Sequence, residues 1–190
     1  MAYVELLDLK TYLGVTEDDD DALLVSLIDR AQAIFDGQTN RTFEATADTT
    51  RRFDAIADVD GATLLLDRDL CSITTITNGD STTVSDDDYV TEPRNTAPYY
   101  AITLKASSGL CWTYVDDPEN AITISGKWAY SSSAPYDIVD ATIRLAVYLY
   151  RIKDANTWDV VAAPEYGTLT IPGGMPRDVR LLLAPYVRRT

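Results

Sequence analysis

The amino-acid sequence predicts an α+β protein, in which helices from both ends of the chain form a bundle around an all-β antiparallel insertion. Apolar residues recur at helical spacing near the two ends, in residues 1–45 and 133–190. Residues 46–132 consist instead of short β-branched and aromatic runs separated by turn residues. No repeat is detectable in this middle part, so we expect one compact antiparallel module.

Two helices are expected before the β part. The first covers residues 5–13 and ends at Gly14, because glycine readily adopts the left-handed conformation that ends helices. The acidic run 17–21 precedes a longer helix, whose apolar residues cover one face and which is expected to stop near Gly37. Carboxylates at this position cap free backbone N–H groups and favour the positive end of the helix dipole. We therefore interpret the acidic run as a helix cap.

Eight short strands are expected in the β part. Its clearest hairpin turns are Asp60-Gly61 and Asn78-Gly79-Asp80, because both contain the residues that tight turns require. The expected strands are 51–57, 62–67, 71–77, 82–84, 88–92, 99–105, 111–115 and 120–130.

Helical spacing returns in residues 136–153, after Pro135. The polar residues of this segment occupy one narrow stripe, and most of the remaining circumference is apolar or aromatic. Such a helix is expected to pack on two sides, the second being either the β part or another subunit. For a subunit contact, the expected residues are Leu145, Tyr148 and Leu149.

The last part of the chain combines a long loop with a short helix. Residues 154–175 contain several glycines and prolines and have no helical period. A structureless loop of this length is unusual in a compact domain unless it is functional. Pro176 suits the first turn of a final helix, which is expected to extend to about residue 187.

The composition argues against several kinds of chemistry. The chain has no histidine, which excludes Ser-His-Asp and Cys-His catalysis and metal ligation by imidazole. Cys71 and Cys111 are expected to be buried free thiols, while a disulfide between them stays open at this point. No apolar stretch approaches the ~20 residues that cross a membrane, and the start of the chain lacks a signal-peptide pattern, so it is interpreted as a mature, unsecreted terminus.

The charge is strongly negative and unevenly distributed. The formal net charge is −14, which opposes adhesion to phosphate backbones and anionic membranes. The last 15 residues nevertheless contain four arginines against one aspartate, a net charge of +3, so that the first 175 residues carry −17. These arginines suit an acidic protein surface better than a nucleic acid.

Several segments, in this order, resemble the head–tail connector (adaptor or head-completion) proteins of tailed phages and related particles. An Asp-rich loop joins a short helix to a long one, and the β part opens with Leu64-Leu-Leu-Asp-Arg-Asp-Leu-Cys-Ser-Ile-Thr-Thr-Ile76. An aromatic-rich helix contains Tyr148-Leu-Tyr-Arg151, and the chain closes with Pro176-Arg-Asp-Val-Arg-Leu-Leu-Leu-Ala-Pro-Tyr186. The resembling segments cover most of the chain.

The resemblance implies a structural protein of the virion neck, made in the host cytoplasm, without catalytic activity or cofactor. Its subunits would form a ring, usually of twelve copies, beneath the portal protein. The ring would extend the DNA channel without binding DNA specifically, and would offer a platform to a downstream tail-proximal connector or stopper protein. We expect the C-terminal segment to dock on the portal through Arg177, Arg180, Leu182, Leu183, Tyr186, Arg188 and Arg189. Closure of the subunit's own bundle by this helix is the alternative.

Two other functions were weighed. The first is a β-sandwich module on a helical stalk that binds carbohydrate or calcium. Trp112, Trp128, Tyr99 and Tyr100 would then form a sugar platform, although core packing is the favoured interpretation of these aromatic residues. The Asp-rich runs at 17–21, 58–61 and 85–88 lack the ligand spacing of an EF-hand loop. The second is a carboxylate-dependent hydrolase, for which 30 acidic residues supply close pairs by chance alone.

Overall fold

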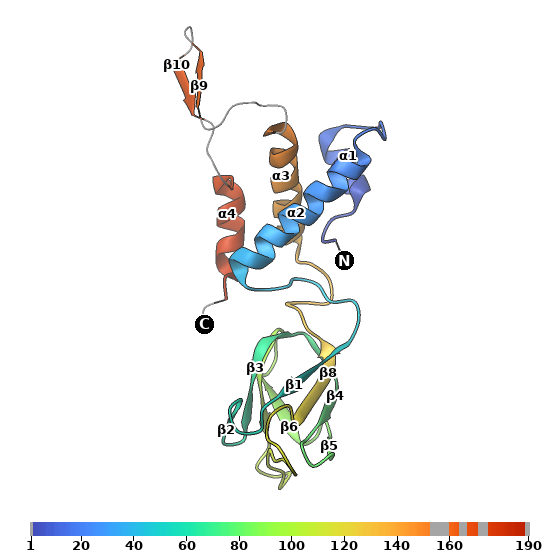
Figure 1. The fold of residues 1–190 in the computed structure, drawn as a ribbon, viewed down its shortest axis with the longest axis vertical. Helices are drawn as coiled ribbons and strands as arrows, with labels where there is room; N and C mark the ends of the chain where they lie inside the picture. Colours follow the sequence, from blue (N-terminus) through green and yellow to red (C-terminus); the bar gives the residue numbers. More distant parts are fainter. Residues whose placement is uncertain (1, 153–159, 164–166, 171–174, 189–190) are drawn as a thin grey trace. The chain divides into compact units, whose positions relative to one another are not determined.

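The computed structural model describes residues 2–152, 160–163, 167–170 and 175–188, which fall into two compact units (Figure 1). Residues 41–134 form one of them, called the β unit below. Residues 2–40 and 135–190 form the other, called the helical unit. The fold is therefore mixed α+β, which confirms the predicted class.

The described residues of the helical unit contain four α-helices. Helix α3 contacts the other three, and its buried residues Ile138, Ala141 and Leu145 recur at helical spacing on one face. Helix α2 adds Leu24, Ile28 and Phe35 to the core. The helices are α1 (Leu6–Leu13), α2 (Asp21–Thr39), α3 (Tyr136–Ile152) and α4 (Arg177–Leu183), with a 3₁₀ turn at Ala184–Tyr186.

Two left-handed residues end the first two helices. Gly14 has φ +70° and ends α1, as the sequence predicted. Helix α2, however, continues past Gly37 and ends at Asn40, which has φ +53°. The prediction of a stop near Gly37 was wrong because glycine tolerates the helical conformation at a moderate cost, while asparagine also accepts the left-handed one.

The β unit consists of two four-stranded antiparallel sheets (Figure 1). The strand orders are β1-β8-β4-β5 and β2-β3-β7-β6. Both predicted turns join paired strands: Asp60 ends β2 and Gly61 follows it before β3, and Asn78-Gly79-Asp80 lies between β4 and β5. The strands are β1 (Thr49–Phe53), β2 (Val59–Asp60), β3 (Thr63–Leu70), β4 (Ser72–Thr77), β5 (Thr83–Val84), β6 (Tyr89–Glu92), β7 (Tyr99–Leu104) and β8 (Ile122–Lys127).

Alternate residues of the strands build one apolar core in the β unit. Ile122, Ile124 and Gly126 of β8 are buried and alternate with half-buried residues, as expected for a strand with one face inward. Strands β3, β4 and β7 add Leu64, Ile76 and Ile102 to the same core. The core therefore draws on both sheets.

One expected strand, residues 111–115, does not form; only Tyr114 makes an isolated bridge, to Gly79. The reason lies in the side chain of Asn78, which is buried beside this segment. Its amide nitrogen donates to the carbonyl of Cys111 at 2.8 Å, and its amide oxygen accepts from the N–H of Thr113 at 3.1 Å. A side chain thus satisfies backbone groups that a strand partner would otherwise have to satisfy.

Part of the expected loop at 154–175 is also corrected by the structure. Strands β9 (Val160–Ala163) and β10 (Gly167–Thr170) pair antiparallel, with Val161 opposite Leu169. The valines and threonines of these short runs favour extended backbone, a signal that the emphasis on glycine and proline obscured. The remaining residues of the expected loop lie outside the described residues, except for Met175.

The two segments that lead into and out of the β unit are bonded to each other. The N–H of Tyr130 donates to the carbonyl of Thr42 at 2.8 Å, and that of Ala45 donates to the carbonyl of Ser131 at 3.3 Å. Arg41 bonds Asp69 at 2.7 Å, and its guanidinium lies 5.5 Å from the centroid of the Tyr130 ring. The chain consequently enters and leaves the β unit at neighbouring points.

Gly126 should be essential to the β unit, whereas Gly37 should be dispensable. A Cβ on Gly126 would lie 2.1 Å from the carbonyl oxygen of Ser72, so Gly126→Ala forces the β4–β8 pairing apart. We expect it to lower the free energy of unfolding by at least about 1–3 kcal/mol. Gly37→Ala, with nothing within 4 Å of the new Cβ, should raise it by about 0.5–1 kcal/mol. Denaturant unfolding of both variants checks this, and equal stabilities would contradict it.

Candidate interaction surfaces

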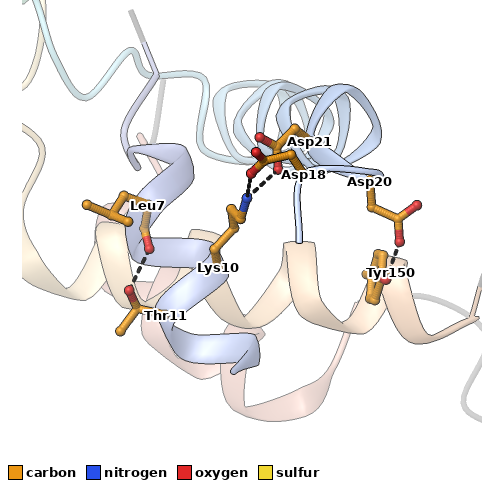
Figure 2. A network of polar contacts seen from close by, with 7 residues as sticks. All are labelled: Leu7, Lys10, Thr11, Asp18, Asp20, Asp21 and Tyr150. Carbon is orange, nitrogen blue, oxygen red and sulfur yellow. Dashed lines mark hydrogen bonds and ion pairs between the residues drawn. The ribbon is translucent and has the colours of Figure 1, made fainter. Parts of the chain in front are cut away.

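Lys10 of α1 is a buried lysine held by two carboxylates of the acidic run (Figure 2). Its Nζ lies 2.7 Å from Asp18 Oδ1 and 2.7 Å from Asp21 Oδ1, and only 8% of the residue is exposed. Asp21 is the first residue of α2, while Asp18 lies in the preceding loop. The ion pairs therefore fasten the start of α2 to α1.

Asp20 extends this cluster to α3. The hydroxyl of Tyr150 donates a hydrogen bond to Asp20 Oδ2, and Figure 2 shows the two side chains facing each other. Asp20 is the residue before α2, but its side chain makes no capping bond to the helix backbone. The expected capping hydrogen bond is thus wrong for Asp20, whose carboxylate binds the tyrosine hydroxyl instead, whereas Asp21 does lie in the first turn of α2, as the dipole argument expects.

The ion pairs shift the pKa of both partners. The hydrogen bonds that Lys10 donates, first to Asp18 and then to Asp21, raise the pKa of Lys10. The bond from Lys10, followed by its charge, lowers the pKa of Asp18. Both shifts favour the charged pair. The sequence contains a signal for this contact, because Lys10 stands on the apolar stripe of α1, one turn after Leu6 and one before Leu13.

The expected subunit-contact residues of α3 differ in burial. Leu145 is almost fully buried inside the helical unit, where it forms part of the subunit's own core. Tyr148 and Leu149 are half-buried, and Tyr150 is half-buried beside Asp20. A contact with a neighbouring copy therefore stays a prediction for Tyr148 and Leu149. Leu145 is buried in the core of its own subunit and is not available for such a contact.

The C-terminal helix uses one face inside the helical unit. Val179 and Leu183 are buried, so Leu183 is a core residue of the subunit itself. Arg144 of α3 donates to Asp178 at 3.1 Å and holds the pKa of that carboxyl below its usual range. The N–H of Arg188 donates to the carbonyl of Thr39, and the hydroxyl of Tyr186 to Asp137. One side of this segment therefore belongs to the subunit.

The opposite face of the C-terminal segment is exposed, basic and partly apolar. Arg177 and Arg180 are exposed, and Leu181 beside them is 65% exposed. Leu182 and Arg188 are half-buried, whereas Arg189 lies outside the described residues. An exposed leucine between arginines is the combination that anchors and orients a partner surface. Leu181 was not among the expected docking residues, since the sequence pattern favoured Leu182 and Leu183.

The aromatic residues of the proposed sugar platform are mostly core residues. The indole N–H groups of Trp112 and Trp128 donate to the carbonyls of Ala62 and Thr49, at 2.9 and 3.0 Å, and both rings are buried. Tyr99 packs against the same core, whereas Tyr100 is exposed. Two buried tryptophans cannot stack on a sugar, so the platform interpretation is wrong for them.

The two cysteines are free thiols, as expected, and differ in exposure. Cys71 is half-buried, its thiol donates to the carbonyl of Lys127 at 3.3 Å, and burial raises its pKa. Cys111 is exposed, which corrects the expectation of a buried side chain. The part of the chain that the structure describes has no group of three or more possible metal ligands from His, Cys, Asp and Glu. It also has no helix long and apolar enough to cross a membrane.

Removing the Lys10 amino group should change both the stability and its pH dependence. We expect Lys10→Met to lower the melting temperature, because Asp18 and Asp21 then lose their partner. Since the pKa of Asp18 is lowered in the folded state, its contribution is present above the ordinary carboxylate pKa and is lost as the pH falls. Since the pKa of Lys10 is raised, its contribution is present at neutral pH and is lost only above its ordinary pKa of 10.5.

Thermal melts of Lys10→Met and the wild type across the pH range test this. The difference in melting temperature between Lys10→Met and the wild type should be largest between the ordinary pKa of a carboxylate and that of Lys10. It should become smaller at more acidic and at more alkaline pH. Arg30→Met, which alters an exposed cation of α2, is the matched control and should have a smaller effect. A pH-independent difference would contradict the account.

Part of this chain matches a known protein family. Residues 3–71 match the family model described as "Phage gp6-like head-tail connector protein". The matched segment includes α1, the acidic run, α2 and the strands up to β3. No curated protein sequence matches the chain.

Two solved structures share the fold over almost the whole chain. A chain from the "Neck of empty GTA particle computed with C6 symmetry" has a TM-score of 0.55 and 17% sequence identity, covering 90% of this chain and 92% of that one. A chain from the "Neck of native GTA particle computed with C12 symmetry" has a TM-score of 0.50, with the same identity and coverage. At this identity the likeness concerns the fold alone. The expected resemblance is thus confirmed: residues 3–71 carry the sequence pattern of the phage gp6-like head–tail connector proteins.

Proposed function

We propose that this chain is a structural subunit of a head–tail connector, located in the neck of a phage or phage-like particle. Its copies form a ring, of twelve subunits in our proposal, beneath the portal protein. The ring extends the DNA channel, provides the attachment platform for a downstream tail-proximal connector or stopper protein, and catalyses no reaction. The observation that carries this proposal is the family match over residues 3–71.

The fold likeness adds support beyond the matched segment. Both neck chains are covered over 92% of their length, so the C-terminal helices and the β unit are included in the comparison. The particle necks themselves were computed with C6 and C12 symmetry, which is compatible with a ring of twelve copies. We accordingly propose a helical bundle made of residues 1–45 and 133–190, with residues 46–132 as an all-β insertion.

The charge of both units suits a wall along which DNA slides. The β unit contains fifteen acidic against seven basic residues, a net charge of −8. The helical unit contains fifteen acidic against nine basic residues, a net charge of −6. A negative wall repels phosphates, so DNA would pass through the ring without specific binding. A predominantly basic lumen in the assembled ring would contradict this.

The proposed contact with the portal uses a different face of the C-terminal segment from the one expected from the sequence. Its buried face closes the helical unit, and its exposed face, with Arg177, Arg180 and Leu181, is left for the partner. The proposed partner surface is apolar at its centre and acidic at its rim. The two interpretations of this helix, bundle closure and docking, are therefore compatible.

Particles produced without this chain test the proposed function. We expect DNA-filled heads that lack tails and leak DNA at the open vertex, and tail attachment should return when the chain is supplied during assembly. Electron micrographs and a DNA-delivery assay measure both effects. Tailed particles that deliver DNA normally in the absence of the chain would rule out the connector role.

Reversing the exposed arginine charges should weaken attachment without harming the fold. Arg177→Glu with Arg180→Glu changes two exposed side chains of α4, outside its buried face of Val179 and Leu183, so the melting temperature should change little. Attachment of the ring to the portal should decrease by about tenfold or more, as expected for two rim charges worth about 1.4 kcal/mol together. Arg30→Glu on α2 is the matched control. Wild-type attachment should also weaken as salt increases; unchanged binding of the double variant would refute the contact.

A further inference from the structure

The short hairpin formed by β9 and β10 has two free edges. Among the described residues these strands are hydrogen-bonded only to each other, in a two-stranded sheet. Each strand has four residues, and Val161 lies opposite Leu169. An isolated two-stranded hairpin is marginally stable in water, since a stable sheet needs at least three strands or a packed face. This hairpin therefore requires a partner.

The other described edge strands have features that prevent them from pairing with another chain, and the hairpin of β9 and β10 differs from them in this respect. Edges β2 and β5 have only two residues each. Edge β1 carries Arg51 and Arg52, and edge β6 ends in Glu92 followed by Pro93. Short length, charge and proline are the features by which sheet edges avoid pairing with other chains.

The hairpin has none of these protections apart from its short length. Its eight strand residues include no charged residue and no proline, although charged residues make up 24% of the whole chain. They are Val160, Val161, Ala162, Ala163, Gly167, Thr168, Leu169 and Thr170. Uncharged, β-branched edges of this kind pair readily with another strand. We expect both edges to be covered in the assembled state.

We propose that the hairpins of neighbouring copies pair with each other, β10 of one copy with β9 of the next, and so close a continuous antiparallel β-barrel inside the ring. This inference rests on the ring proposed above. Within one hairpin the strands run antiparallel, so the free edge of β10 meets the β9 edge of the next copy in antiparallel orientation as well. Repetition around a closed ring leaves no free edge.

A second copy of this chain accounts for both edges of the hairpin, whereas a strand from a different protein accounts for only one. Each hairpin offers two edges, and a single foreign strand covers only one of them. In a ring, every copy supplies one β9 edge and one β10 edge, so the numbers of free edges match without any further partner. Seven residues separate the end of α3 from β9, and a segment of this length can span up to roughly 24 Å.

Disulfide trapping between differently labelled copies tests this pairing. The background is the full-length chain with Cys71→Ser and Cys111→Ser, which must itself assemble. One variant carries Ala162→Cys in β9, and the others carry Thr168→Cys, Leu169→Cys or Thr170→Cys in β10, because the register between copies has to be found. Each chain then has one thiol, so no disulfide can form within a chain. Rings assembled from each variant alone and from pairwise mixtures are oxidised and analysed on denaturing gels.

We expect covalent dimers in at least one mixture and in none of the single-variant rings. Two β9 strands of neighbouring copies are separated by an intervening β10, about 10 Å apart, whereas a disulfide requires Cβ atoms about 4 Å apart. Intact rings without dimers in any mixture would overturn the hairpin pairing and leave the connector role standing. Disulfides formed equally well by single variants, or trapping to another neck protein through an added thiol, would overturn it as well. Failure of the background chain and the wild type to form rings at all would overturn both proposals.

Discussion

The bonding between the two segments that lead into and out of the β unit is the constraint on which the rest of the structure depends. Tyr130 and Ser131, close to the end of this unit, are hydrogen-bonded to Thr42 and Ala45, close to its start. The guanidinium of Arg41 bonds Asp69 and lies over the Tyr130 ring, which adds a charge contact and a cation–π contact at the same point. Because the chain enters and leaves the β unit at neighbouring points, this bonding is compatible with one helical unit made of residues 2–40 and 135–190.

Within the helical unit, polar contacts complete what apolar packing begins. The apolar stripes of α2 and α3 supply the core, and a comparable stripe in α1 is interrupted by Lys10. The burial of that lysine depends on Asp18 and Asp21, which neutralise its charge. The neighbouring Asp20 binds Tyr150 of α3. The acidic run therefore joins three helices.

Periodicity and turn chemistry were sufficient to predict most elements, whereas side-chain contacts over long distances in sequence were not. The four helices, the hairpin turns and the buried tryptophan rings follow from local patterns of apolar and turn residues. The loss of a strand at 111–115 depends on Asn78, more than thirty residues earlier, which no local pattern reveals.

Leu183 was assigned to a partner because α4 was considered alone, yet the helical unit buries it. Its neighbour Leu181, one position earlier, is exposed instead, since burial depends on the rotation of a short helix against α3. Leu145 and Leu183 thus belong to the subunit's own core, and the contacts expected of α3 and α4 with other chains stay predictions.

The central claim is that copies of this chain form the ring between head and tail. An electron-microscopic reconstruction of the particle neck, at a resolution sufficient to fit the helical unit and the β unit separately, measures this most directly. The account predicts a ring of this chain directly beneath the portal, with the exposed arginines of α4 turned toward the portal and an acidic inner wall. Density for this chain in the head shell or the tail tube, or its absence from the mature particle, would contradict it.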